Sequence, residues 1–209
     1  MPLLTRALGR NTTRAMARAR LGGAWRCGWA LAVVAALVPV AAIGTTAAPR
    51  TVAQEYDLKA AFLFNFAQFV EWPADAFAEP GTPITIGILG QDPFGSSLDD
   101  IVAGETVHNR PLAVRRYQSV DQIESCQILF ISPSEAPRLD QIMKALAHRS
   151  VLTVGETKDF THSGIVAFDV IQRRVRLRVN LAAATEARLT ISSKLLRQAQ
   201  IVKSSGGRN

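Results

Sequence analysis

Acidic residues are missing from the N-terminal segment of this sequence. All six charged residues before Pro49 are arginines: Arg6, Arg10, Arg14, Arg18, Arg20 and Arg26. The chain of 209 residues carries a net charge of +7, but without these six arginines it has 18 basic and 17 acidic residues, a net charge of +1. The basic character therefore belongs to the N-terminal segment, and the rest of the chain has no excess positive charge to attract nucleic acid.

Cysteine is nearly absent. Cys27 lies in the N-terminal segment, and the remaining Cys126 cannot form an internal disulfide by itself. Cys126 begins the apolar run CQILFI, which predicts a small buried residue; a bridge between two molecules is the alternative. The three histidines, at positions 108, 148 and 162, are dispersed without the paired spacing of metal ligands, so no metal site is expected.

Motifs of catalysis and of cofactor binding are also lacking. The sequence has no G-x-S-x-G nucleophile elbow and no H-E-x-x-H helix. The segment GQDPFG (90–95) lacks both the Lys-Ser/Thr ending of a P-loop and the glycine spacing of a dinucleotide-binding loop. We therefore expect a protein that is not an enzyme and that needs no cofactor.

No apolar run reaches the length of about 20 residues that a transmembrane helix typically needs. The run from Trp29 to Val40 has 12 residues, follows an arginine-rich start and precedes the small residues AAIGTTAAP. This order is typical of a Sec-type signal peptide, with an uncleaved anchor as the alternative. We expect a signal peptide over residues 1–48, a periplasmic mature protein, a short N-terminal segment over 49–54 and a flexible tail over 203–209.

The remaining chain alternates short apolar runs with helical patterns. Buried strands are predicted at 84–90, 111–117, 127–132 and 151–155, and a hairpin of two strands at 164–171 and 174–180. Helices are predicted at 97–103, 120–125 and 137–148, and again over 181–189 and 192–202. This alternation predicts an α/β fold, a three-layer sandwich in which helices flank a mixed, mostly parallel, Rossmann-like sheet.

The stretch YDLKAAFLFNFAQFVEWP (56–73) predicts a helix that ends at Trp72-Pro73. Its apolar side chains fall on one broad arc that only Lys59 interrupts, so most of the stretch is expected to be core. Phe64 lies on the polar side of this helix. It is predicted either to anchor a protein interface or to be covered by a neighbouring segment.

Polar residues follow several of the predicted strands at their carboxyl ends, where open α/β sheets bind ligands. They predict a small-molecule pocket lined by Asp92, Phe94, Ser132, Ser134, Glu135 and Glu156. Surface loops alone would explain the same residues.

The strand RRVRLRVN alternates arginines with aliphatic residues, so Arg174, Arg176 and Arg178 share one face. Arg176 and Arg178 are candidates for an anionic ligand or partner, because arginine binds carboxylate and phosphate in two-point contacts. The alternative is a solvent face that protects an edge strand.

Taken in order, the segments YDLKAAFLFNFAQFVEWP, ITIGILGQDPFG, NRPLAVRR, CQILFISPSE, VLTVGE and VRLRVNLAAATEARLTISSKLLRQAQIV resemble the YfiR-like family of exported bacterial proteins. The resemblance covers roughly residues 55–202. It implies an α/β sandwich in the periplasm that binds the periplasmic region of a membrane diguanylate cyclase and represses it, which lowers cyclic di-GMP and biofilm formation.

Other partners remain open. Some family members are sensor modules, so the resemblance allows another membrane signalling protein as the partner. A periplasmic small-molecule-binding protein is the alternative function, and a homodimer is compatible with the sequence. Control by internal disulfides, which the family's best-known repressor uses, is not expected in a mature chain whose single cysteine is Cys126.

Overall fold

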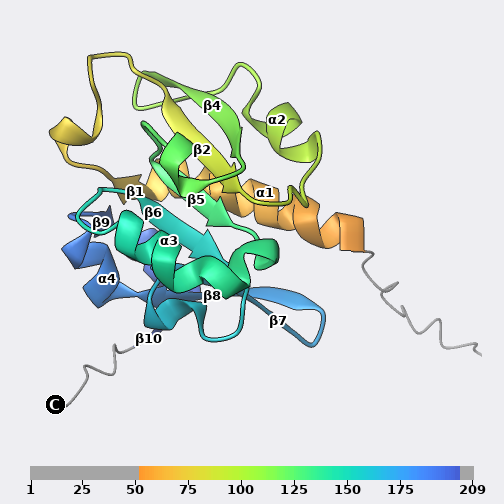
Figure 1. Cartoon of the computed structure of the whole chain (residues 1–209). Coiled ribbons are helices and arrows are strands. Elements are labelled where there is room, and N and C mark those ends of the chain that lie inside the picture. The colour runs from red at the N-terminus through yellow and green to blue at the C-terminus, as the bar shows by residue number, and fades with distance from the viewer. Residues whose placement is uncertain (1–51, 203–209) are drawn as a thin grey trace, which may run out of the picture. The chain divides into compact units, whose positions relative to one another are not determined.

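The computed structural model describes residues 52–202, and the predicted signal peptide and flexible tail lie outside these residues. Within them, eight strands form one sheet in the order β10-β8-β7-β6-β5-β2-β4-β3 (Figure 1). These strands are β2 (Ile84–Leu89), β3 (Thr106–Val107), β4 (Arg110–Tyr117), β5 (Ile128–Ile131), β6 (Leu152–Gly155), β7 (Val166–Ile171), β8 (Arg174–Asn180) and β10 (Ala199–Val202). A separate antiparallel pair joins β1 (Val70–Glu71) to β9 (Thr190–Ile191).

The central part of the sheet is parallel. β2 pairs in parallel with β4 on one side and with β5 on the other, and β6 and β7 continue in the same direction. β8 is antiparallel to β7, so the sheet is mixed as predicted. Because the chain winds outward from β2 in both directions, the loops after β2 and β5 stand at the topological switch point of a doubly wound sheet.

Helices cover both faces of this sheet, which confirms the three-layer α/β sandwich. α1 (Val52–Phe69) lies behind the sheet in Figure 1, and α3 (Leu139–Ala145) lies in front of β5 and β6. The other helices are α2 (Ser97–Val102), α4 (Leu181–Glu186) and α5 (Ser193–Leu196), with 3-10 turns η1 (Ala74–Ala76), η2 (Val120–Gln122), η3 (Pro133–Arg138) and η4 (Phe160–His162). None of the helices between residues 52 and 202 is both long and apolar enough to span a membrane.

The larger core lies between α1 and the sheet. Leu63 and Phe66 of α1 are fully buried, as are the alternate residues of β2 that point toward them. Phe66 stacks on Phe168 of β7 with ring centroids 6.1 Å apart, and Phe62 lies 6.0 Å from the same ring. Aromatic pairs of this kind hold α1 across the middle of the sheet.

The smaller core lies under α3. It joins Leu89, Leu129 and Ile131 of the sheet to Ile142 of α3. Its other buried members are Tyr117, Ile123, Cys126, Leu146, Val151, Phe160 and Ala167. At Gly87 an added Cβ would lie 2.7 Å from the Tyr117 ring and 2.8 Å from Cys126 Sγ. Gly87 is therefore required where β2 passes under these side chains.

Several predicted helices are shorter in the structure, and within two of them the chain forms a strand that the sequence pattern did not predict. α1 ends at Phe69, because Val70 and Glu71 leave the helix to pair with β9. The predicted C-terminal helix over 192–202 stops after Leu196, and Ala199–Val202 form the parallel edge strand β10 beside β8. Both differences arise from long-range strand pairing, which overrides local helix propensity. α1 also begins at Val52, inside the expected N-terminal segment.

The burial of the α1 side chains predicts how much stability is lost when one of them is shortened to alanine. Leu63→Ala or Phe66→Ala is expected to lower the free energy of unfolding by about 2 to 5 kcal/mol, through lost burial and a residual cavity. Urea unfolding followed by circular dichroism measures this. Gln68→Ala, on the exposed side of α1, should change the stability by less than about 0.5 kcal/mol; equal stability of all these variants would contradict the assignment of the core.

Candidate functional site

The carboxyl edge of the parallel strands brings together the residues that the sequence pointed to. Asp92 and Phe94 follow β2, Ser132 to Glu135 follow β5, and Glu156 follows β6. The backbone N–H of Gln91 donates to Ser134 Oγ at 3.0 Å, so the first two loops touch. An added Cβ at Gly90, where φ is +88°, would lie 2.5 Å from Ser134 Oγ. Glycine at this position thus permits both the left-handed turn and the close approach of the loops.

The loop after β2 is closed by Asp92 and Arg116. Asp92 Oδ1 accepts from the N–H of Phe94 at 2.7 Å, and its Oδ2 accepts from Arg116 Nε at 2.7 Å. Arg116 also donates to Asp99 Oδ2 at 2.5 Å and to the Gly95 carbonyl at 2.8 Å. Its hydrogen bond lowers the pKa of Asp99 below the usual value for a carboxyl group. Arg116 therefore fastens the loop to β4 and α2, and the Asp92 carboxylate is engaged by groups of the same domain.

Phe94 and Glu135 are turned inward at the same edge. The Phe94 ring is buried and makes edge-to-face pairs with Phe130 and Tyr56, with ring centroids 4.8 Å and 5.6 Å apart. Glu135 is 5% exposed and pairs with Arg138 at 2.6 Å, while Ser132 Oγ accepts from the Ser134 N–H at 3.4 Å. These side chains fill the place where doubly wound folds usually bind ligands. Their predicted role in binding a ligand stays a prediction.

The centre of this edge is a buried ionic cluster that we call the α1 clamp, made of Glu55, Tyr56, Lys59 and Glu156. Lys59 is only 1% exposed. Its Nζ pairs with Glu55 Oε1 at 2.5 Å, pairs with Glu156 Oε2, and lies 4.4 Å from the centroid of the Tyr56 ring. The Tyr56 hydroxyl donates a hydrogen bond to Glu156 Oε1, with the two oxygens 2.7 Å apart. The clamp therefore fastens the first turns of α1 to the end of β6.

The chemistry of the α1 clamp is that of a structural cluster. The Lys59 ammonium meets two carboxylates and an aromatic face, so its polar partners are supplied by the protein where water is excluded. Burial, and then the hydrogen bond to Glu156, raises the pKa of Tyr56 well above its usual value. A phenol in this state holds its proton, so its hydroxyl can orient Glu156 but is poorly suited to transfer a proton.

Three members of the clamp were not among the predicted site residues. Glu156 was predicted, whereas Tyr56 and Lys59 were predicted only as parts of the helix over 56–73, and Glu55 lies just before that predicted helix. A signal for them did exist, because Lys59 is the one charged residue on the apolar arc of the helix. A lysine at such a position requires a buried carboxylate from another element.

The predicted arginines lie apart from this edge, on β8. Arg178 contacts Asp169 of β7, with Nη2 3.2 Å from Oδ1 and Nε 2.5 Å from Oδ2; the first contact is an aligned hydrogen bond and the second an ion pair without that alignment. Arg176 is exposed and lines a shallow groove beside Leu58 and Phe62 of α1. Two strands, β7 and β6, separate β8 from β5 in the sheet, so these arginines form a second region of the surface.

Phe64 is half-buried and packs against the larger core. It lies seven residues after Asp57, hence on the same side of α1. Asp57 Oδ1 accepts from Ser97 Oγ at 2.6 Å, which places α2 along this side. The predicted part of Phe64 in an interface stays a prediction.

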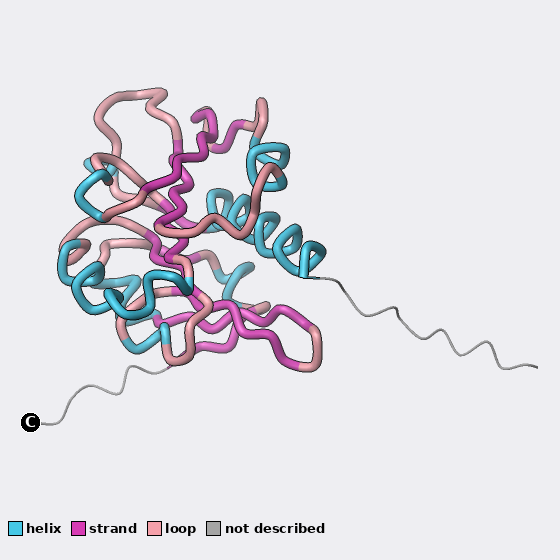
Figure 2. The backbone as a smooth tube through the Cα atoms, turned by 45° about the vertical axis from the view of Figure 1, so that its right-hand side comes forward, coloured by secondary structure: helices cyan, strands magenta, loops and turns pink. Residues whose placement is uncertain are grey.

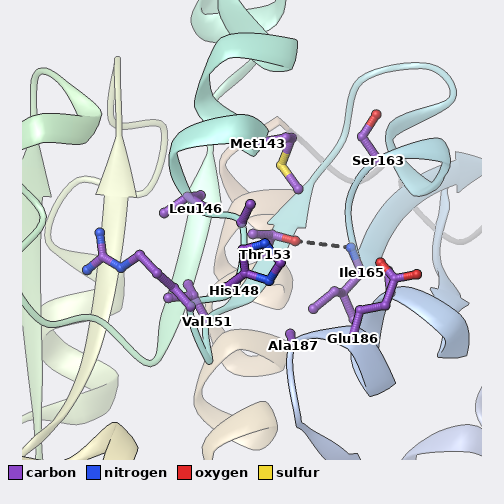
Figure 3. Close-up of a pocket in the computed structure, with 12 residues that line it drawn as sticks. Met143, Leu146, His148, Val151, Thr153, Ser163, Ile165, Glu186 and Ala187 are labelled. Carbon is purple, nitrogen blue, oxygen red and sulfur yellow. Dashed lines mark hydrogen bonds between the residues drawn. The ribbon is translucent and has the colours of Figure 1, made fainter.

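A pocket of about 350 Å³ opens at the other end of β6, between α3 and α4 (Figure 3). Its apolar lining includes Met143, Leu146, Val151, Ile165 and Ala187, and Thr153 Oγ1 accepts from the Ile165 N–H at 3.1 Å. His148 and Glu186 supply polar groups at the pocket. Sequence reasoning missed this pocket because it lies at the amino end of β6.

Neither a metal cluster nor a reactive thiol is found in the described part of the chain. Between residues 52 and 202, no group of three or more His, Cys, Asp or Glu side chains is placed to hold a metal ion. Cys126 is buried, its Sγ lies 3.0 Å from the Ile128 carbonyl oxygen, and burial raises its pKa to about 12.

Comparison with known protein families matches residues 56–200 to the family model described as YfiR/HmsC-like. None of the curated proteins compared with the chain matches it. The matched range begins in the second turn of α1 and ends in β10, so it includes Tyr56, Lys59 and Glu156 of the α1 clamp, both cores and the hairpin of β7 and β8.

The α1 clamp yields a prediction about stability. Lys59→Met is expected to lower the free energy of unfolding by about 3 to 5 kcal/mol, because Glu55 and Glu156 then lose their buried cation. Lys59→Met combined with Glu156→Gln should recover part of that loss. Lys194→Met, at an exposed lysine of α5, is the matched control and should be nearly neutral. A single Lys59→Met variant as stable as the native protein would refute the clamp.

The burial of Cys126 yields a prediction about reactivity. With a thiol pKa of about 12, only about one molecule in ten thousand carries the thiolate at pH 8. Labelling by a thiol reagent is therefore expected to be slow in buffer and fast in urea. Rapid labelling of the folded protein, or a disulfide-linked dimer on a non-reducing gel, would contradict this.

Proposed function

Because the chain belongs to the YfiR/HmsC-like family, we propose that it is an exported, non-catalytic regulator that represses a membrane diguanylate cyclase. In this function the mature domain binds the periplasmic region of the cyclase and holds it inactive. Cyclic di-GMP and biofilm formation then fall. The observation that carries the proposal is the family match over nearly all of the described domain, residues 56–200 of 52–202.

The geometry of the carboxyl edge supports a binding function over a catalytic one. Asp92, Glu135 and Glu156 are each engaged by a basic side chain of the same domain, at Arg116, Arg138 and Lys59 respectively. A general base or nucleophile must instead be free to meet its substrate. Regulation by contact needs none of these groups, since it depends on the outer surface of the domain.

Phe64 is the candidate anchor in that surface. It is an aromatic residue at the border between the core and the polar side of α1, on the side of the helix that also carries the exposed residues Asp57 and Gln68. Aromatic side chains with a polar surround are enriched among the residues that contribute most to protein interfaces. A ring that is already held by the core loses little freedom when a partner covers its exposed part.

The test is cyclic di-GMP measured in cells that carry both the chain and the membrane diguanylate cyclase. Deleting the gene for the chain is expected to raise cyclic di-GMP several-fold, and Phe64→Ala should mimic the deletion at equal protein level. Phe62→Ala is the matched control, because Phe62 is a half-buried phenylalanine of the same helix on another side. Unchanged cyclic di-GMP on deletion would overturn the proposed function, and repression by a stably folded Phe64→Ala variant would place the interface elsewhere.

The pocket between α3 and α4 favours a second candidate, a periplasmic small-molecule-binding protein or sensor module that serves another receptor or transporter. Its apolar lining, with His148 and Glu186 beside it, could take a small organic ligand that carries a polar group. The cyclic di-GMP measurement separates the two functions. A protein that serves another receptor should leave cyclic di-GMP unchanged when its gene is deleted.

A further inference from the structure

The hairpin of β7 and β8 ends in an unusual combination of exposed aliphatic and unpaired basic side chains. Val170 is 47% exposed and Ile171 is 54% exposed, and they directly precede the turn Gln172-Arg173. Figures 1 and 2 show that this hairpin extends beyond the neighbouring strands of the sheet. The aliphatic residues therefore stand at the end of a projection, where water surrounds them.

Basic side chains are concentrated on this same hairpin. Residues 52–202 contain 15 basic and 17 acidic side chains, so the domain has a net negative charge, yet four of the 15 lie within residues 173–178. Arg178 is paired with Asp169. Within the described residues no acidic side chain pairs with Arg173, Arg174 or Arg176. The hairpin tip is thus a local site of positive charge on a domain that is otherwise slightly acidic.

The geometry of a two-stranded ribbon decides what kind of surface fits this tip. Successive residues of a strand point to opposite faces, so Val170 and Ile171 lie on different faces of the hairpin. Val170 is opposite Val175, whereas Ile171 is opposite Arg174. Exposed aliphatic groups are therefore present on both faces. A protein partner covers one face of a hairpin, whereas lipid surrounds a tip that enters it.

We propose that the β7–β8 hairpin tip inserts Val170 and Ile171 into the interface of an anionic phospholipid bilayer, with Arg173, Arg174 and Arg176 on the lipid phosphates. Short aliphatic side chains favour the boundary of the acyl chains, and arginine places its stem along apolar surface while its guanidinium contacts phosphate. Such contacts are individually weak. They orient the domain at the membrane surface and raise its local concentration there.

The inference does not depend on the proposed repression of a cyclase. A domain at the membrane would meet the periplasmic region of any membrane signalling protein in a restricted set of orientations. The alternative occupant of the tip is an acidic segment of such a protein. The alternative with no partner is that the arginines only prevent edge pairing of the sheet.

Vesicle binding tests the proposal directly. The mature chain from residue 49 onward contains all of the residues that the structure describes, and it is mixed with vesicles of phosphatidylethanolamine that contain about 30% phosphatidylglycerol, at low salt. We expect it to float with these vesicles, but not with vesicles of neutral phosphatidylcholine, and to be released at high salt. Soluble glycerol phosphate in excess should not release it, since the aliphatic contacts require a bilayer.

Paired variants assign the binding to the tip. Arg174→Gln with Arg176→Gln should weaken vesicle binding about 20- to 30-fold, since each basic residue near an anionic surface changes affinity about five-fold. Arg115→Gln with Lys144→Gln removes the same charge from β4 and α3, at two exposed positions, and should have little effect. Val170→Ser with Ile171→Ser should weaken binding with an unchanged melting temperature.

Four outcomes would overturn the proposal. The first is absence of binding to anionic vesicles, and the second is equal loss in the two charge variants. The third is full binding by the Val170→Ser, Ile171→Ser variant, which would show simple charge attraction without insertion. Binding only to vesicles that contain a membrane diguanylate cyclase would assign the tip to a protein partner. None of these outcomes bears on the change of cyclic di-GMP upon gene deletion, so the two proposals fail separately.

Discussion

The position of the first turns of α1 depends on one buried charge, the ammonium group of Lys59. Eighteen residues of helix lie across the sheet, and their apolar contacts with Phe168 and the strands are strongest in the later turns. The first turns would be free to fray without a further contact. Lys59 supplies it by pairing with Glu156 at the end of β6 and with Glu55 on its own helix. Removing a charge from water is costly, so the cluster is stable only while all its partners are in place.

This clamp determines what the carboxyl edge of the sheet can do. The switch point of a doubly wound sheet is normally open to a ligand, but here Tyr56 covers it from α1 and Phe94 fills it from the loop after β2. Arg116 then ties that loop to α2. The groups that could contact other molecules are displaced to the outer side of α1, the α3–α4 pocket and the β7–β8 hairpin. A regulator that acts by contact is consistent with such a domain, in which a rigid interior carries interaction surfaces on its exterior.

Much of this arrangement could be predicted from the sequence, because local patterns dictate it. The strand ITIGIL is apolar except for Thr85, and the hairpin around Gln172-Arg173 alternates regularly, so both were predicted. The segment Ala199–Val202 was predicted as a helix but is a strand. Its pairing with β8 could not be predicted, because four residues that include both polar and apolar side chains show no strand pattern. The edge residues Asp92, Phe94, Ser134 and Glu156 were placed together correctly by sheet topology. Their engagement with Arg116 and Lys59 depends on side-chain packing between distant elements, which spacing along the chain does not reveal.

The central claim is that Lys59 makes the start of α1 as firmly held as its end. Hydrogen–deuterium exchange of the native protein, resolved to individual amides of α1, tests it most directly. The account predicts that the amides of Tyr56 to Phe62 are protected to within about ten-fold of those of Leu63 to Phe69, because both halves open only with the whole domain. Exchange of the first group about a thousand-fold faster than the second would show that the first turns open locally, and that the clamp does not hold the helix.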